Sequence, residues 1–254
     1  MNKKIVIENI NDRYFDGFYQ EIWRQTVPEQ TTAKEIAYII EGLKTPSGGH
    51  VIDLMCGYGR HSIALASQGF KVTAVDNLAN YTDEILKVAA KESLSIEVVN
   101  ANIATFTPPE ATAELCICMG NSINFFPEKD VKIILERMHG ALKTYGKILI
   151  NTWSLIEIVT KGFVSNSWSE FEDLTLLSES RYLFNPTRVE TSTTILKNGA
   201  VAEVKLAIDY LFGMSELISL IEAVGFQEVK AFSIPGRKEF QLGDSRAYIV
   251  ATKL

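Results

Sequence analysis

Between residues 50 and 155 the chain alternates short runs of Val, Ile and Leu with longer segments in which apolar residues recur at helical spacing. Nearly continuous apolar runs are typical of strands that are buried on both faces of a parallel sheet. The segments between them are typical of amphipathic helices. The runs are HVIDLMC, KVTAVD, SIEVVNAN, AELCICMG and GKILINTW. Their regular alternation predicts a doubly wound α/β domain.

The pattern changes after Trp153. Polar and apolar residues then alternate, as they do in half-exposed antiparallel strands, in the segments DLTLLSESRYLFN, RVETSTTILKNG and VAEVKLAIDYLF. Asn198-Gly199 between two of these segments predicts a tight hairpin. The helix and strand pattern then returns with MSELISLIEAVG. We therefore interpret residues 160–212 as an antiparallel β-insert after the fifth strand of a single domain, 1–254. We expect this insert to cover a substrate pocket.

The N-terminal part, residues 1–45, is interpreted as a helical lid region. TTAKEIAYIIEGLK has apolar residues at helical spacing, and Thr32 with Glu35 matches a capping signal that would start this helix at Thr32. The preceding aromatic segment contains Tyr14, Tyr19 and Trp23, which are candidate substrate contacts. An amphipathic helix that packs on a sheet explains the same three residues equally well.

A Gly-x-Gly turn is followed, one apolar run later, by an aspartate. The first apolar run ends near Cys56, so Gly57 and Gly59 occupy the turn before a helix. Glycines allow a tight turn and close approach of a ligand, and the helix N-terminus offers free N–H groups. Asp76 ends the next run, where a carboxylate can accept hydrogen bonds from a ribose diol. With Asp53 inside the first run, this pattern predicts a nucleoside-type ligand.

The order of residues distinguishes between nucleoside ligands. A dinucleotide fingerprint would have a third glycine where this chain has Ser62. The chain instead has D-x-x-x-G-x-G from Asp53 to Gly59, and VIDLMCGYGRHSIALASQGFKVTAVD resembles the first motif of class I S-adenosylmethionine-dependent methyltransferases. Four further segments resemble later motifs of that family, namely VVNANIATF, AELCICMGNSINFF, ALKTYGKILINTWS and LIEAVGFQEV. Asn102 stands where Asp is commoner, and Tyr145 replaces a glycine.

The resemblance implies a seven-stranded, mainly parallel sheet with an antiparallel last strand, and S-adenosylmethionine as cofactor. Residues 46–155 match well and the C-terminal third more loosely. The backbone of Cys56, Gly57 and Gly59 would line the methionine part, and Asp76 would hold the ribose. The remaining implied contacts are Asn77 and Leu78 beside the adenine, Asn102 and Ile103 at its edge, and Met119 beneath the sulfonium.

Composition restricts the class of methyl acceptor and the cellular compartment that we expect. The chain has an apolar share of 46%, and its net charge of −6 gives no overall attraction to nucleic acid or anionic membrane. The N/D-P-P-Y/F and Pro-Cys signatures of base methylation are absent from the sequence. Cys56, Cys116 and Cys118 lack metal-ligand spacing, so no metal site is expected. We expect a cytoplasmic enzyme without membrane contact, acting on a small molecule.

The chemistry favours an amine acceptor. A neutral amine needs no strong base, whereas a hydroxyl usually does, and none of His50, His61 and His139 is placed as a base by the pattern. No catalytic residue is assigned, and Tyr210 joins the candidate acceptor contacts. The alternatives are a protein or RNA acceptor, a nicotinamide oxidoreductase, and a non-enzymatic cofactor-binding module. The apolar face of the β-insert also needs cover, which the main domain or a second copy in a homodimer would supply.

Overall fold

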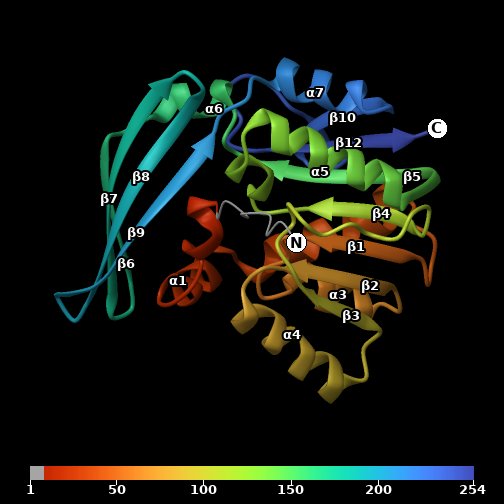
Figure 1. Ribbon diagram of the computed structural model, residues 1–254, viewed down its shortest axis with the longest axis horizontal. Helices are drawn as coiled ribbons and strands as arrows, with labels where there is room; N and C mark the ends of the chain where they lie inside the picture. Colours follow the sequence, from red (N-terminus) through yellow and green to blue (C-terminus); the bar gives the residue numbers. More distant parts are fainter. Residues whose placement is uncertain (1–8) are drawn as a thin grey trace, which may run out of the picture. The chain divides into compact units, whose positions relative to one another are not determined.

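The computed structural model describes residues 9–254 and divides the chain into two compact units (Figure 1). One unit combines the described part of Met1–Thr26 with Val164–Asp209. The other, larger unit combines Val27–Phe163 with Tyr210–Leu254. The first eight residues of the predicted lid region lie outside the described residues. The single-domain interpretation, with its lid, stays a prediction.

The larger unit is built on an eight-stranded sheet in the order β11-β10-β12-β5-β4-β1-β2-β3. The strands are β1 (His50–Leu54), β2 (Lys71–Asp76), β3 (Ile96–Asn100), β4 (Ala113–Cys118), β5 (Leu142–Thr152), β10 (Phe226–Ile234), β11 (Lys238–Glu239) and β12 (Ala247–Lys253). Neighbours from β3 to β5 pair in parallel, and β12 runs antiparallel to both β5 and β10. The predicted doubly wound, mainly parallel fold is confirmed, and the short β11 adds an edge strand to the seven expected ones.

Helices cover both faces of this sheet. The helical segments are α2 (Glu29–Ala37), a π-helical turn η2 (Tyr38–Gly42), α3 (Arg60–Ser67), α4 (Ala79–Glu92), the 3₁₀ turn η3 (Ser122–Phe125), α5 (Glu128–Ala141), α6 (Ile156–Gly162) and α7 (Met214–Ala223). One buried cluster joins α5 and α7 to Ile52 and Leu54 of β1. The other joins α2, α3 and α4 to Val51 of the same strand. Because successive strand residues face opposite clusters, both must be apolar, which explains the continuous apolar runs.

The start of α2 differs from the sequence prediction. The helix begins at Glu29 with Pro28 as its N-cap, not at Thr32. A proline suits a helix start because its missing N–H needs no partner there. Thr32 and Glu35 therefore lie inside the helix, where both accept hydrogen bonds from the Arg60 guanidinium. Among the helices of residues 9–254, none has the length and apolar character needed to cross a lipid bilayer.

The smaller unit contains a four-stranded sheet in the order β6-β7-β8-β9. Its elements are the 3₁₀ turn η1 (Ile10–Arg13), α1 (Tyr19–Thr26), β6 (Asn166–Phe171), β7 (Leu174–Phe184), β8 (Thr187–Lys197) and β9 (Ala200–Tyr210). Asn198 and Gly199 connect β8 to β9 with φ angles of 50° and 78°, so the predicted tight turn is confirmed. Ile22 of α1 packs against Leu174 and Ile195 of the sheet.

Two asparagines stabilise the chain segments of the larger unit that lead to and from residues 164–209. Asn124 is fully buried, and its amide donates to the carbonyls of Ser154 (2.9 Å) and Tyr210 (2.8 Å). Its Oδ1 accepts the Thr152 hydroxyl at 2.6 Å. Asn121 Oδ1 accepts the backbone N–H groups of Trp153 and Ser154, both at 2.9 Å. Side-chain hydrogen bonds within the larger unit therefore link the segment directly after β5 to Tyr210 at the end of β9.

We expect Asn124→Ala to lower the free energy of unfolding by roughly 2–4 kcal/mol, because the Ser154 and Tyr210 carbonyls would lose their side-chain donor and a cavity would form. Urea unfolding followed by circular dichroism measures the change. Asn166→Ala, at an exposed position, is the matched control and should shift stability by less than about 0.5 kcal/mol. Equal midpoints for the two variants would contradict the proposed importance of the Asn124 hydrogen bonds.

Candidate cofactor site

The predicted cofactor residues meet at the carboxyl ends of four neighbouring strands, β4, β1, β2 and β3. The chain order reverses between β1 and β4, and such a switch point is where open α/β sheets bind ligands. The backbone joins the strand ends directly. Cys56 N–H donates to the Val75 carbonyl at 3.1 Å, and Ala101 N–H donates to the Asp76 carbonyl at 2.9 Å. The structure thus brings together residues that are far apart in the sequence.

The glycine turn has a geometry that requires glycine. Gly57 and Gly59 have φ angles of 55° and 81°, in the left-handed region. A Cβ on Gly59 would lie 2.6 Å from Ile85 of α4, so this glycine also permits close helix packing. At Gly57, by contrast, no heavy atom of the described chain lies within 4 Å of the Cβ position. A ligand can therefore approach the backbone at Gly57.

Asp76 connects the turn to the second strand. This buried carboxylate accepts Gly57 N–H at 2.8 Å through Oδ2 and Leu78 N–H at 3.0 Å through Oδ1. Burial raises the pKa of Asp76, and the hydrogen bonds from Leu78 and Gly57 oppose that rise only in part. Each carboxylate oxygen has further acceptor capacity. The two oxygens therefore suit a ribose diol.

Asp53 lies beneath the turn, almost completely buried in β1. Its Oδ2 accepts the Ser62 hydroxyl at 2.6 Å, and burial raises the pKa of this carboxyl despite His61 and Ser62. Ser62 thus provides a hydrogen bond where a dinucleotide fingerprint would have its third glycine. Two buried carboxyl groups with raised pKa values therefore lie at this edge, which marks it as a candidate ligand site.

The other predicted cofactor residues follow β2, β3 and β4. Asn77 and Leu78 precede α4, with Leu78 as its N-cap. Asn102 accepts Ala104 N–H at 2.9 Å in the loop after β3, and the Ile103 carbonyl accepts the Arg137 guanidinium at 2.5 Å. Met119 is buried just after β4. Their contacts with a cofactor stay predictions.

A buried ionic cluster behind the turn was not predicted. Glu35 Oε2 lies 2.5 Å from Arg60 Nη1 and 2.8 Å from His61 Nε2, and its Oε1 accepts the Tyr248 hydroxyl at 2.8 Å. Burial alone would raise the pKa of Glu35, but the hydrogen bond and charge of His61, with the charge of Arg60, lower it from 4.5 to about 2. Arg60 and His61 begin α3, so the cluster fixes the helix whose N-terminus the glycine turn precedes. No local pattern in the sequence announces these contacts.

The candidate acceptor residues are divided between the two units. Tyr14, Tyr19 and Trp23 belong to the smaller unit, where Tyr14 lies 4.6 Å from Tyr19 between ring centroids and Phe15 contacts all three rings. The Tyr14 hydroxyl also bonds Thr193 of β8 at 3.0 Å. Tyr210 belongs to the larger unit and packs on its core. Their role toward an acceptor remains a prediction.

Comparison with known proteins agrees with this geometry. A family model described as a methyltransferase domain matches residues 51–146, the segment that contains the glycine turn and Asp76. Residues 51–146 carry a methyltransferase domain of the class I S-adenosylmethionine-dependent type. The cofactor of this methyltransferase domain is therefore S-adenosylmethionine, as the sequence predicts.

Several known proteins resemble the chain beyond that segment. Glycine N-methyltransferase of Rattus norvegicus is 28% identical over 178 residues, which cover 62% of this chain and 59% of the relative. A methyltransferase structure from Clostridium acetobutylicum superposes with a TM-score of 0.78 at 13% identity, covering 93% of this chain and 96% of the other. The sugar N-methyltransferase KedS8 from Streptoalloteichus gives a TM-score of 0.70 at 17% identity, covering 100% and 98%.

We expect Asp76→Asn to weaken S-adenosylmethionine binding by at least about tenfold, because the amide nitrogen cannot accept a hydrogen bond and the negative charge is lost. Isothermal titration calorimetry measures this affinity. Asp83→Asn makes the same chemical change at an exposed position on α4 and should bind the cofactor normally. If both variants bind like the wild type, Asp76 does not contact the cofactor.

Glu35 should stabilise the fold in a pH-dependent way. Because its pKa is lowered from 4.5 to about 2, its contribution is fully present above about pH 4.5 and is lost as the pH falls toward 2. We therefore expect Glu35→Gln to unfold much more easily than the wild type at neutral pH, and the difference to shrink at about pH 3. Urea unfolding at both pH values tests this, with Glu41→Gln as an exposed control. A difference that is independent of pH would refute the assignment.

Proposed function

We propose that the protein transfers a methyl group from S-adenosylmethionine to an amine nitrogen of a small molecule. The amine assignment rests on one observation: every histidine already makes a structural contact. His50 is the first residue of β1, at the amino end of the strand, and its ring nitrogen lies 2.8 Å from the Thr73 hydroxyl oxygen. His61 is buried against Glu35. His139, in the last turn of α5, packs its ring against Phe226 at 5.0 Å. An amine lone pair needs no such base.

The protein's part in this reaction is mainly alignment. When bound, S-adenosylmethionine supplies a methyl group on a positively charged sulfur, which is already a good leaving group. The glycine turn and Asp76 would hold the nucleoside end, so that the methyl group faces the acceptor at the carboxyl ends of β4 and β5. Holding two reactants in line contributes roughly 7–11 kcal/mol to the rate enhancement of such reactions. A chemically active side chain is then not required.

The known proteins support nitrogen as the acceptor atom. The rat relative is a glycine N-methyltransferase, and one structural neighbour is a sugar N-methyltransferase. Both names place the methyl group on the amine of a small molecule. The chain spans about 59% of the length of the rat relative, so its acceptor and complete activity are inferred from the site and the chemistry, and not from that relative alone.

We expect labelled methyl transfer from S-adenosylmethionine to a nitrogen when the protein is incubated with small amines such as glycine, sarcosine or glucosamine. Mass spectrometry identifies the methylated atom and the released S-adenosylhomocysteine. The rate should rise with pH until the acceptor amine is fully neutral, because only the neutral form has a free lone pair.

The two primary amines have matched controls in which a hydroxyl replaces the amino group, namely glycolate for glycine and glucose for glucosamine. These controls should accept no methyl group. Methylation of oxygen at comparable rates would refute the amine assignment while keeping the methyltransferase activity. Labelling that appears only in added protein or RNA would replace the small-molecule acceptor with a macromolecular one.

A further inference from the structure

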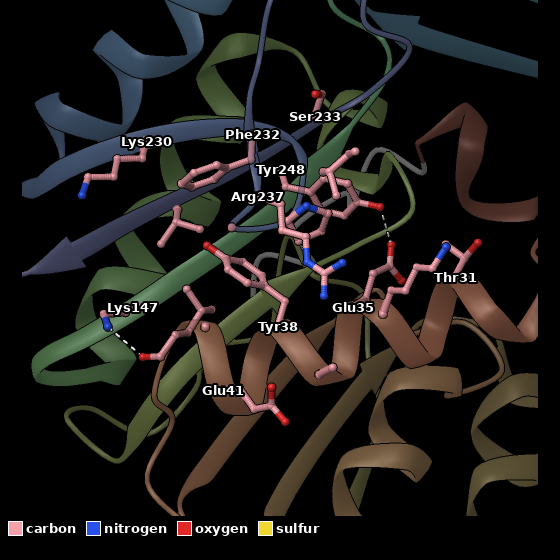
Figure 2. Close-up of a pocket in the computed structure, with 18 of the residues that line it drawn as sticks. Thr31, Glu35, Tyr38, Glu41, Lys147, Lys230, Phe232, Ser233, Arg237 and Tyr248 are labelled. Atoms are coloured by element: carbon pink, nitrogen blue, oxygen red, sulfur yellow. Dashed lines mark hydrogen bonds between the residues drawn. The ribbon is translucent and has the colours of Figure 1, made fainter.

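The larger unit contains a cavity that the cofactor assignment does not use. Its volume is about 740 Å³, and it lies between α2 with η2 on one side and strands β10 and β12 on the other (Figure 2). As far as the described residues form its lining, none of the predicted cofactor contacts is included. Small-molecule sites have volumes of about 300–1,000 Å³. The cavity is therefore large enough for a ligand the size of an aromatic acid or a nucleotide.

Aromatic rings form the apolar part of the wall. Tyr38 and Phe232 meet edge to face, with ring centroids 6.2 Å apart and an interplanar angle of 64°, and Tyr248 also lines the cavity. The Tyr38 ring occupies space that only glycines leave open, since a Cβ on Gly236 would lie 2.3 Å from the ring and one on Gly42 would lie 2.2 Å from it. The position of this ring is thus set by its neighbours. A flat apolar group can stack on such a rigid surface.

The charges around the cavity are not balanced by one another. Within residues 9–254, the lining side chains without an ion-pair or hydrogen-bond partner are three cations and two carboxylates, namely Lys34, Lys230, Arg237, Glu41 and Glu228. The third carboxylate of the wall, Glu35, is already neutralised by Arg60 and His61. The lining therefore has an excess of unpaired positive charge.

Arg237 is placed to use that charge. In Figure 2 its side chain extends between Tyr38 and Glu35, whereas the Glu41 carboxylate points away from both Tyr38 and Arg237. Lys34 of α2 also lines the cavity and adds to its positive charge. A guanidinium binds a carboxylate, sulfonate or phosphate with two parallel hydrogen bonds.

We propose that this cavity is a second binding site, for a small molecule that combines an anionic group with a flat apolar body. Arg237 binds the anionic group, Lys34 adds positive charge to the lining, and the apolar body packs against the Tyr38 and Phe232 rings. This ligand is distinct from the cofactor and from the methyl acceptor, which bind at the carboxyl edge of the parallel strands.

The test uses 8-anilinonaphthalene-1-sulfonate as the probe, with the full-length protein and saturating S-adenosylhomocysteine to fill the cofactor site. We expect a saturable rise in fluorescence. The double variant Lys34→Gln/Arg237→Gln should bind the probe at least about tenfold more weakly. Both side chains are exposed, so the fold should persist, and thermal unfolding checks this. Lys132→Gln, an exposed lysine on α5 outside the cavity, should behave like the wild type.

Competition separates the anionic group from the apolar body. Phenyl phosphate should displace the probe, whereas inorganic phosphate at the same concentration should not, because it cannot contact the rings. Unchanged probe binding by the double variant would overturn the proposed site. Displacement by inorganic phosphate as effective as that by phenyl phosphate would also overturn it, since the cavity would then bind any anion.

Discussion

The hydrogen bond from Gly57 N–H to the Asp76 carboxylate joins the ends of two parallel strands. Both residues are positioned by backbone geometry, Gly57 by its left-handed φ angle and Asp76 by its place at the end of β2. Burying a carboxylate is costly, and here backbone N–H groups rather than a cation oppose the cost, so the pKa of Asp76 remains raised. The glycine turn, the start of α3 and the edge of β2 all depend on this contact. The same carboxylate keeps acceptor capacity for a ligand.

Glu35 shows the opposite electrostatic solution a short distance away in the same unit. It is as buried as Asp76, but Arg60, His61 and Tyr248 surround it, and its pKa is lowered to about 2. A carboxylate that is fully paired stabilises a fold and has little to offer a ligand. One that is buried without a full set of partners is a candidate site. The pKa values of Glu35 and Asp76 therefore shift in opposite directions, because only Glu35 has cationic partners.

Asn124 places a further constraint on the larger unit. It bonds the carbonyls of Ser154 and Tyr210, which stand on either side of the segment that forms the smaller unit. Asn124 thus links the chain that follows β5 to the chain at the end of β9.

The sequence by itself determined the features that depend on residues near each other in the chain. Apolar runs specified the strands, glycines specified the turn after β1, Asp76 marked the end of β2, and Asn198-Gly199 specified the hairpin, because backbone preference and side-chain period are local properties. The tertiary structure decided the rest. Glu35 looked like a capping residue, but its partners include Tyr248, which is 213 residues away, and the helix starts earlier, after Pro28. Ser62 looked like a missing glycine until the fold placed Asp53 beside it. A buried charge pairs with the groups that tertiary packing brings near it, and the local sequence does not specify those groups.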